Sequence, residues 1–181
     1  MSAAEKKIII SDAAGLDAGT LRGVIRAVEL TFDYPTETTA LLHDFSFAYD
    51  INRGQYHSTL VLEKLTALAP RRALKVLAFT DVDLFIPILT HVFGEAQLGG
   101  VSCIVSTHRL DVDLSAADGR RLFQTRVAKE AVHELGHTFS LRHCRDKSCI
   151  MHYCHSVLDV DAKSNRLCRY CRVLLADEKN A

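Results

Sequence analysis

The residues best suited to chemistry lie in one string, AVHELGHTFSLRHCRDKSCIMHYC, at positions 131–154. On a helix, His133 and His137 lie on nearly the same face, because four residues make one turn plus about 40°. Both imidazoles can therefore bind one metal ion. His143 reaches that ion only if the helix ends and the chain folds back. Three neutral imidazoles on zinc leave a fourth position open for water.

Glu134 is the candidate acid/base of this string. It is rotated about 100° from His133 on a helix, so it can reach a zinc-bound water without being a ligand. Zinc lowers the pKa of such a water toward ~7 and polarises a carbonyl group. Glu134 would take the proton of the water and deliver it to a leaving amine. HExxH alone also occurs by chance in amphipathic helices, so His143 and a later methionine carry much of this interpretation.

Four of the six cysteines predict a second metal site, because C-x4-C followed by C-x2-C is typical of structural zinc. They are Cys144, Cys149, Cys168 and Cys171. Four thiolates leave no position for water. Two disulfides or free buried thiols are the alternative, which the lack of a signal peptide at the N-terminus disfavours. Because His143 and Cys144 are adjacent, we expect loss of this zinc to loosen the third histidine.

The string HELGHTFSLRH resembles the metzincin signature, in which a Met-turn follows the third histidine. Met151 stands where that methionine would lie, beneath the zinc histidines. The surrounding C-x4-C-x-M and the later C-x-x-C narrow the resemblance to the archaemetzincins. The stretches FTDVDLFIP and FGEAQLGGVSCIVSTHRL also resemble that family, and the resemblance is weakest before about residue 40. It implies two Zn2+ per chain and hydrolysis of peptide or protein substrates, with short peptides and aminopeptidase action suggested.

Three residues near the motif carry separate expectations. Ser140 stands where the metzincin pattern has glycine, so we expect strained backbone with positive φ at the turn. Tyr153 lies at the offset where astacin-like metzincins bring a tyrosine to the metal, but a wall aromatic is favoured here. Cys154 reads as a small buried hydrophobe, and Cys103 as part of a strand core.

Hydrophobic periodicity predicts the elements that position these residues. Strands are expected at 6–11, 43–50, 73–80 and 101–106, with 81–99 irregular. A first helix is expected at 18–32, capped by Asp17, and a second at 58–69, capped by Ser58. The long zinc helix is expected at 115–139, where Ser115 and Asp118 form a capping pattern at its start. A last helix is expected at 160–176.

The predicted fold class is α/β, an α+β zincin-like fold once the resemblance is included. It has a mixed twisted sheet of four to five strands packed with helices. One compact catalytic domain would comprise an N-terminal subdomain, 1–140, and a C-terminal subdomain, 141–181, with the Met-turn and the four-cysteine site. The resemblance also implies that strand 101–106 is an edge strand able to pair with an extended peptide, unless 81–99 covers it.

Composition limits the partners. The 22 basic and 22 acidic residues cancel, so no global field favours nucleic acid or an anionic membrane. No apolar window approaches the ~18 residues of a membrane span. We expect a cytoplasmic monomer. The alternatives are a catalytically silent, zinc-stabilised binding module and, less favoured, nucleic-acid binding through the basic cysteine-rich tail. That tail contains Arg166, Arg169 and Arg172, but it has few aromatics and no C2H2 spacing.

Overall fold

The computed structural model describes residues 6–111 and 118–180. Its centre is a five-stranded mixed sheet in the order β2-β1-β5-β8-β7. This confirms the predicted α/β class with a mixed sheet. The first four strands are parallel, and β7 pairs antiparallel with β8. Their bounds are Thr36–Thr38 for β2, Lys7–Asp12 for β1, Ala73–Thr80 for β5, Ser102–Ser106 for β8 and Gly94–Ala96 for β7.

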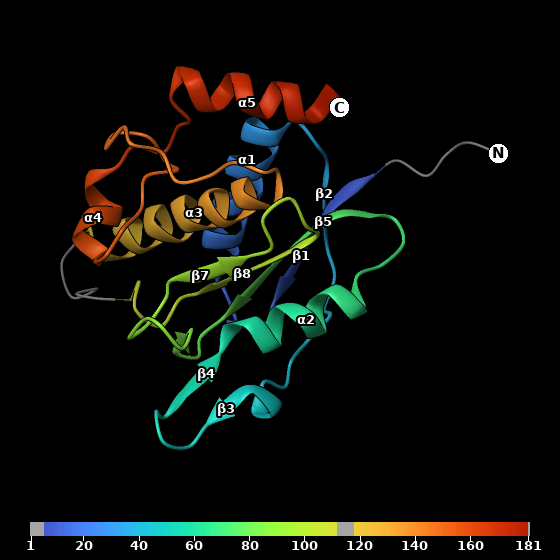
Figure 1. Cartoon of the computed structure of the whole chain (residues 1–181), viewed down its shortest axis with the longest axis vertical. Helices are drawn as coiled ribbons and strands as arrows, with labels where there is room; N and C mark the ends of the chain where they lie inside the picture. The colour runs from blue at the N-terminus through green and yellow to red at the C-terminus, as the bar shows by residue number, and fades with distance from the viewer. Residues whose placement is uncertain (1–5, 112–117, 181) are drawn as a thin grey trace.

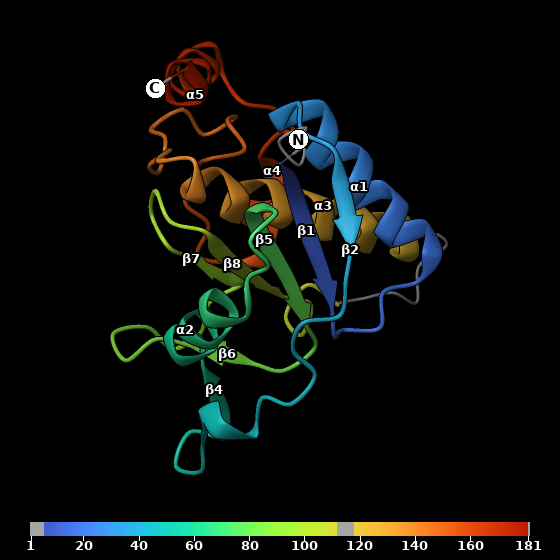
Figure 2. The ribbon, with the colours of Figure 1, turned by 90° about the vertical axis from the view of Figure 1, so that its right-hand side faces the viewer.

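Helices cover both faces of this sheet, which is why its central strands are apolar on both sides. Helices α1 (Ala18–Phe32) and α3 (Gly119–Thr138) lie on one face, and α2 (Ser58–Leu68) lies on the other (Figures 1 and 2). Along β5, Leu77 and Phe79 enter the core under α1 and α3, whereas Ala78 enters the core under α2. Successive side chains of β5 therefore point to opposite faces of the sheet and pack into two separate cores.

The first helix begins as the sequence predicts. The Asp17 carboxylate accepts hydrogen bonds from the backbone N–H of Gly19 and Thr20, which are otherwise unpaired at a helix start. Leu21 and Ile25 of α1 are partly buried against the same core as Val28. The fully buried positions of α1 are Thr20, Val24, Val28 and Phe32.

The predicted strand at 43–50 is wrong. The Asp44 carboxylate accepts from the Ser46 backbone N–H and hydroxyl, which favours a turn over an extended chain. A 3-10 helix, Ser46–Ala48, follows, and Phe47 is 45% exposed. The short strand β3 (Tyr49–Asp50) then pairs with β4 (Gln55–His57), and β4 pairs with β6 (Leu84–Phe85) in a second sheet.

Three further predictions need correction. Residues 81–99 are not irregular throughout, since they contain β6 and β7. Ser58 is the first residue of α2 and does not cap it, because its hydroxyl bonds to Phe85 O and to Glu95. Within α2, Leu62 is buried and Leu68 is 39% exposed. At the start of α3, Asp118 makes no capping bond through its side chain, and Ser115 lies outside the described residues.

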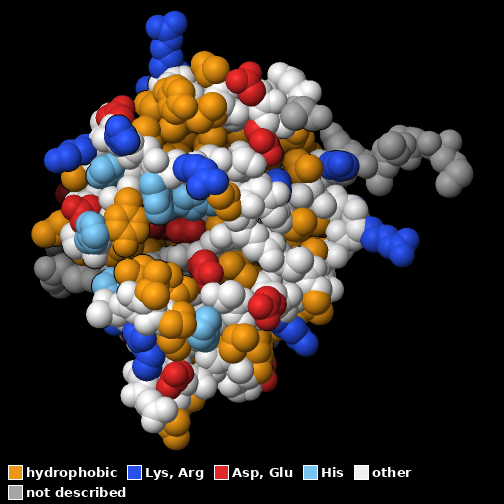
Figure 3. Space-filling model, viewed as in Figure 1, with side chains coloured by type: hydrophobic (Ala, Val, Ile, Leu, Met, Phe, Trp, Pro, Cys, Tyr) orange, Lys and Arg blue, Asp and Glu red, His pale blue; other side chains and the backbone are white. Residues whose placement is uncertain are grey.

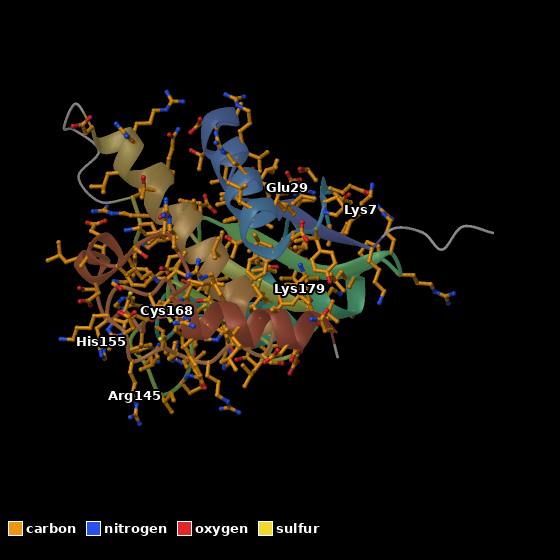
Figure 4. All side chains as sticks on the ribbon, turned by 90° about the horizontal axis from the view of Figure 1, so that it is seen from above. Lys7, Glu29, Arg145, His155, Cys168 and Lys179 are labelled. Atoms are coloured by element: carbon orange, nitrogen blue, oxygen red, sulfur yellow. The ribbon has the colours of Figure 1, made fainter. Side chains whose placement is uncertain are left out.

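The predicted last helix, 160–176, is two helices, α4 (Val157–Ala162) and α5 (Arg169–Asn180). Lys163 ends α4 in an extended conformation, and its side chain is fully buried against Glu130 of α3. That buried ion pair outweighs helix continuation. Helix α5 lies over the end of α1, where Lys179 donates to Phe32 O at 2.8 Å (Figure 4). Among the described residues, no helix has the length and hydropathy needed to cross a membrane.

Candidate metal centres

The structure brings His133, His137 and His143 together. Their metal-binding atoms lie within 4.8 Å of one another. The Nδ1 atom of His133 lies 2.8 Å from Ile150 O, and that of His137 lies 2.7 Å from Leu141 O. These carbonyls can only accept, so each Nδ1 carries the proton and each Nε2 presents a lone pair.

The geometry of this histidine group fits zinc. The Nε2 atoms of His133 and His137 are 3.2 Å apart. Two nitrogens on one tetrahedral zinc lie about 3.3 Å apart when each bond is about 2.05 Å long. Burial lowers the pKa of all three histidines, well below the usual value for His133 and to about 4 for His137. The imidazoles are therefore neutral near pH 7, which is the form that binds zinc.

Met151 packs beneath these histidines and is fully buried. Its side chain lies against Gly136, one residue before His137 in α3. A Cβ at Gly136 would come within 2.6 Å of Met151 Sδ, closer than real contacts allow. The zinc helix and the Met151 segment therefore approach each other closely because position 136 has no side chain.

We expect Gly136→Ala to lower the free energy of unfolding by about 1–3 kcal/mol, because the added methyl group overpacks this contact. Denaturant titration of the zinc-loaded chain measures the change. Gly23→Ala is the matched control. Nothing lies within 4 Å of its added Cβ on α1, so it should stabilise by about 0.5–1 kcal/mol. Equal stability of the two variants would contradict the close packing.

The turn between His137 and His143 has the predicted strain. Ser140 has φ of 61°, a left-handed conformation that glycine adopts without cost. Its N–H bonds to His137 O, and its hydroxyl donates to the exposed Glu178 carboxylate at 2.9 Å. The turn lets the chain reverse after α3, so that Leu141 O can meet His137 and His143 can return to the group.

Ser140→Gly is therefore expected to leave stability unchanged or raise it by about 1 kcal/mol. Relief of the left-handed penalty, about 1–2 kcal/mol, offsets a lost exposed hydrogen bond of about 0.5–1 kcal/mol. Thermal unfolding of the zinc-loaded variant measures the outcome. A loss of more than about 1 kcal/mol would mean that the Glu178 contact, and not the backbone, determines this turn.

Glu134 lies in the pocket that contains the histidine group. This pocket has a volume of about 420 Å3, and Figure 3 shows histidine side chains around a hollow with acidic side chains at its floor. A Cβ at Gly94 would lie 2.6 Å from Glu134 Cγ, so the backbone of β7 runs directly against this carboxyl. Burial, and then the nearby Glu130, raise the pKa of Glu134 well above its usual value.

Two buried charges near the histidines were missed in the sequence. Lys163 is fully buried, with its Nζ 2.7 Å from Glu130 Oε1 and 3.5 Å from His133 Nδ1. Glu130 also lines the pocket. Its position three residues before His133 on the same helix was the available signal, since such residues are neighbours on a helix. Lys163 gave no signal, because a lone lysine is normally a surface residue.

The four cysteines of the second predicted site also lie together, with their sulfurs within 4.8 Å of one another. All six cysteines are free, so the disulfide alternative is not what the structure shows. Cys144 Sγ and Cys168 Sγ are 3.8 Å apart. Two sulfurs on one tetrahedral zinc at about 2.3 Å would be about 3.8 Å apart. The backbone N–H of Cys171 points at Cys168 Sγ, as suits a thiolate.

The sulfurs of Cys168 and Cys171 lie together at the start of α5 (Arg169–Asn180). Cys168 precedes α5, and Cys171 lies in its first turn. Figure 4 shows Cys168 at the start of this helix. The helix therefore begins at the four-cysteine group, and the backbone N–H of Cys171 in its first turn faces the Cys168 sulfur.

The lesser candidates have distinct places. Tyr153 lines the pocket, and its ring packs edge-on against the His143 ring with 4.9 Å between the ring centroids. This is the position expected of an aromatic residue in the pocket wall. Cys154 and His155 also line the pocket, whereas His152 bonds to Cys144 O. Cys103 is fully buried. Arg142 also lines the pocket, whereas Arg145 is exposed. Arg109 forms a bidentate pair with Asp83, with both hydrogen bonds 2.7 Å long.

The edge of the main sheet differs from the sequence expectation. Strand β8 is internal, because β7 pairs with it on the side of the pocket. The edge strand is thus β7, which lies within the stretch predicted to be irregular. Its residues Gly94, Glu95 and Ala96 all line the pocket.

Comparison with known proteins agrees with these features. The sequence model of peptidase family M54 matches residues 34–177 of this chain. An archaemetzincin of Methanocaldococcus jannaschii is 38% identical over 132 residues, 72% of each chain, and one of Methanopyrus kandleri is 43% identical over 71% of this chain and 70% of its own. The M. kandleri crystal structure has a TM-score of 0.84 at 31% identity, covering 100% and 99% of the two chains. A zinc-dependent peptidase from Methanocorpusculum labreanum has a TM-score of 0.82 at 27% identity, covering 93% and 99%.

The fold and the two donor groups, taken with these relatives, define a zinc metallopeptidase, a hydrolase whose substrates are peptides or proteins. The chain belongs to peptidase family M54, the archaemetzincins, as the sequence motifs indicated. The cofactor prediction is confirmed, because a three-histidine group and a four-cysteine group fit a catalytic and a structural zinc.

Proposed function

We propose that this metallopeptidase binds its catalytic zinc through His133, His137 and His143 and uses Glu134 as acid/base, acting as an aminopeptidase on short peptides. The observation that carries the proposal is the convergence of two Nε2 lone pairs, 3.2 Å apart, in the pocket that also contains the Glu134 carboxyl. Cys144, Cys149, Cys168 and Cys171 would hold the structural zinc.

Zinc, when bound, supplies Lewis-acid chemistry that acidifies a water molecule and polarises the scissile carbonyl. The chain contributes the rest. Glu134 would take a proton from the attacking water and later give it to the leaving amine. The Ile150 and Leu141 carbonyls keep the two helical imidazoles oriented.

Strand β7 supports the binding of an extended peptide. Within residues 6–111 and 118–180 it is the edge strand of the sheet, so its outer backbone groups have no partner strand there. A substrate pairing there would lie across Glu134, because Gly94 touches that side chain. Backbone pairing tolerates different substrate sequences.

Acidic side chains in the pocket favour a substrate with a free amino terminus. Glu95 and Glu130 both line the pocket, alongside Glu134. Lys163 neutralises Glu130, whereas Glu95 accepts hydrogen bonds from the hydroxyls of Ser58 and Thr59. An ionised Glu95 would therefore attract the ammonium group of a short peptide.

A peptide library with free and acetylated amino termini tests this proposal on the zinc-loaded chain. Cleavage restricted to the first residue of free peptides is the expected result. Internal cleavage of both sets would retain the peptidase and overturn the aminopeptidase assignment. No cleavage of any peptide would contradict the catalytic proposal and favour the zinc-stabilised binding module.

A further inference from the structure

A second hollow, of about 670 Å3, lies between α1 and α3, which run side by side (Figures 2 and 4). Residues 165–167 and the start of α5 complete its lining. We call it the α1–α3 groove. Its described lining shares no residue with the histidine pocket. Val132 lines the groove and His133 lines the pocket, so the two hollows lie on different sides of α3.

Four arginines from separate parts of the fold line this groove, and no described acidic residue does. They are Arg26, Arg121, Arg166 and Arg172. All four are exposed, and within residues 6–111 and 118–180 none forms an ion pair. Glu29 on the neighbouring stretch of α1 bonds instead to Thr36. Because the whole chain has zero net charge, this positive lining reflects local segregation and not a basic protein.

The remaining lining is largely apolar. Val132, Ile150 and Leu167 are buried at the groove, and Leu30 is 75% exposed beside them. No aromatic residue is among the described residues that line it. An apolar centre with an arginine rim is typical of protein–protein contacts. Stacking platforms for nucleic-acid bases would need aromatic side chains.

We propose that the α1–α3 groove binds an acidic segment of a partner protein, with carboxylates on the arginines and an apolar side chain beside Leu30. Guanidinium groups bind carboxylates with two parallel hydrogen bonds, which favours this chemistry. The volume is that of a pocket for a few side chains and is too small for a duplex. Since the groove and the histidine pocket are separate, binding leaves the active site open.

Fluorescence anisotropy with a short labelled peptide of glutamates around a Leu-x-x-Leu core tests the proposal. The zinc-loaded full chain carries Glu134→Gln so that the probe is not cut. The double variant Arg26→Gln with Arg172→Gln should weaken binding about tenfold. The matched control is Arg22→Gln with Arg169→Gln, which removes two exposed arginines from the same helices outside the groove. It should change affinity less than about twofold.

Two further arms test the apolar contact and the class of partner. Replacing the leucines of the probe by serine, or Leu30 by serine, should also weaken binding. Equal losses in the groove and control variants would overturn the proposal, as would no binding. Tighter, groove-dependent binding of oligothymidylate or of inorganic phosphate would overturn it too, as would self-association of the chain that the groove variant abolishes. In an otherwise unmodified chain, the groove variant should retain peptide hydrolysis, which separates this test from that of the catalytic proposal.

Discussion

Glu134→Gln is expected to lower kcat/KM for peptide hydrolysis by about 10²–10⁴-fold while both zinc ions stay bound. Removal of a positioned general acid/base has effects of that size. Glutamine keeps the shape of the side chain against the β7 backbone, so packing at Gly94 is preserved. The loss should therefore appear in the chemical step and not in folding. Steady-state kinetics with a zinc analysis of each preparation measure it.

Glu63→Gln is the matched control, because Glu63 is an exposed residue of α2 outside the pocket. It should keep parental kinetics and zinc content. If the Glu134 variant kept more than about a tenth of the activity, Glu134 would not be the acid/base. Loss of zinc from that variant would instead make Glu134 part of the metal site itself.

Cys168→Ser is expected to remove the structural zinc and, with it, part of the catalytic zinc. The third histidine, His143, is bonded covalently to Cys144, and Cys144 N donates to Met151 O at 2.9 Å. The four-cysteine group is thus joined to the histidine group in two ways. One is the peptide bond between His143 and Cys144, and the other is the hydrogen bond from Cys144 to Met151, which packs beneath the histidines. Structural zinc contributes roughly 10 kcal/mol in small zinc domains. At about 2–4 °C per kcal/mol, even half of that should lower Tm by more than about 10 °C.

Cys154→Ser makes the same chemical change at a thiol outside the four-cysteine group. It should bind two zinc ions and unfold near the parental temperature. Differential scanning calorimetry and zinc counting compare the two variants. Coupling between the sites would be refuted if Cys168→Ser kept a fully occupied histidine site and full activity.

The sequence predicted best those features that depend on local geometry. The spacing of His133 and His137 determines a shared helix face whatever packs around it. The strain at Ser140 was predicted because serine stands where the metzincin pattern has glycine at the turn, and φ of 61° agrees with it. Asp17 was recognisable as a cap from its type and position alone.

Features that depend on distant partners could not be predicted in this way. The alternation of Phe45, Phe47 and Tyr49 indicated a strand, but the turn at Asp44 begins a 3-10 helix in which Phe47 is exposed. The burial of Lys163 requires Glu130, 33 positions earlier, and only the tertiary fold brings them together.

The division into subdomains at residue 140 stays a prediction. Residues on both sides of that boundary share one core, in which Ile8 and Val28 lie in the same cluster as Met151 and Leu175. The C-terminal segment is thus packed on the same layer as α1 and α3. It is held there by α5, whose Lys179 bonds to Phe32 O.

The most direct test of the account is the zinc content of the purified chain together with the ligands of each ion. We predict two zinc ions per chain. The X-ray absorption spectrum should then be the average of one zinc with four sulfur ligands and one zinc with nitrogen and oxygen ligands. In a variant with His133 and His137 replaced by alanine, one zinc with four sulfur ligands should remain. A parent chain that holds one zinc on four sulfurs and none on the histidines, even with zinc in excess, would contradict the proposed catalytic site.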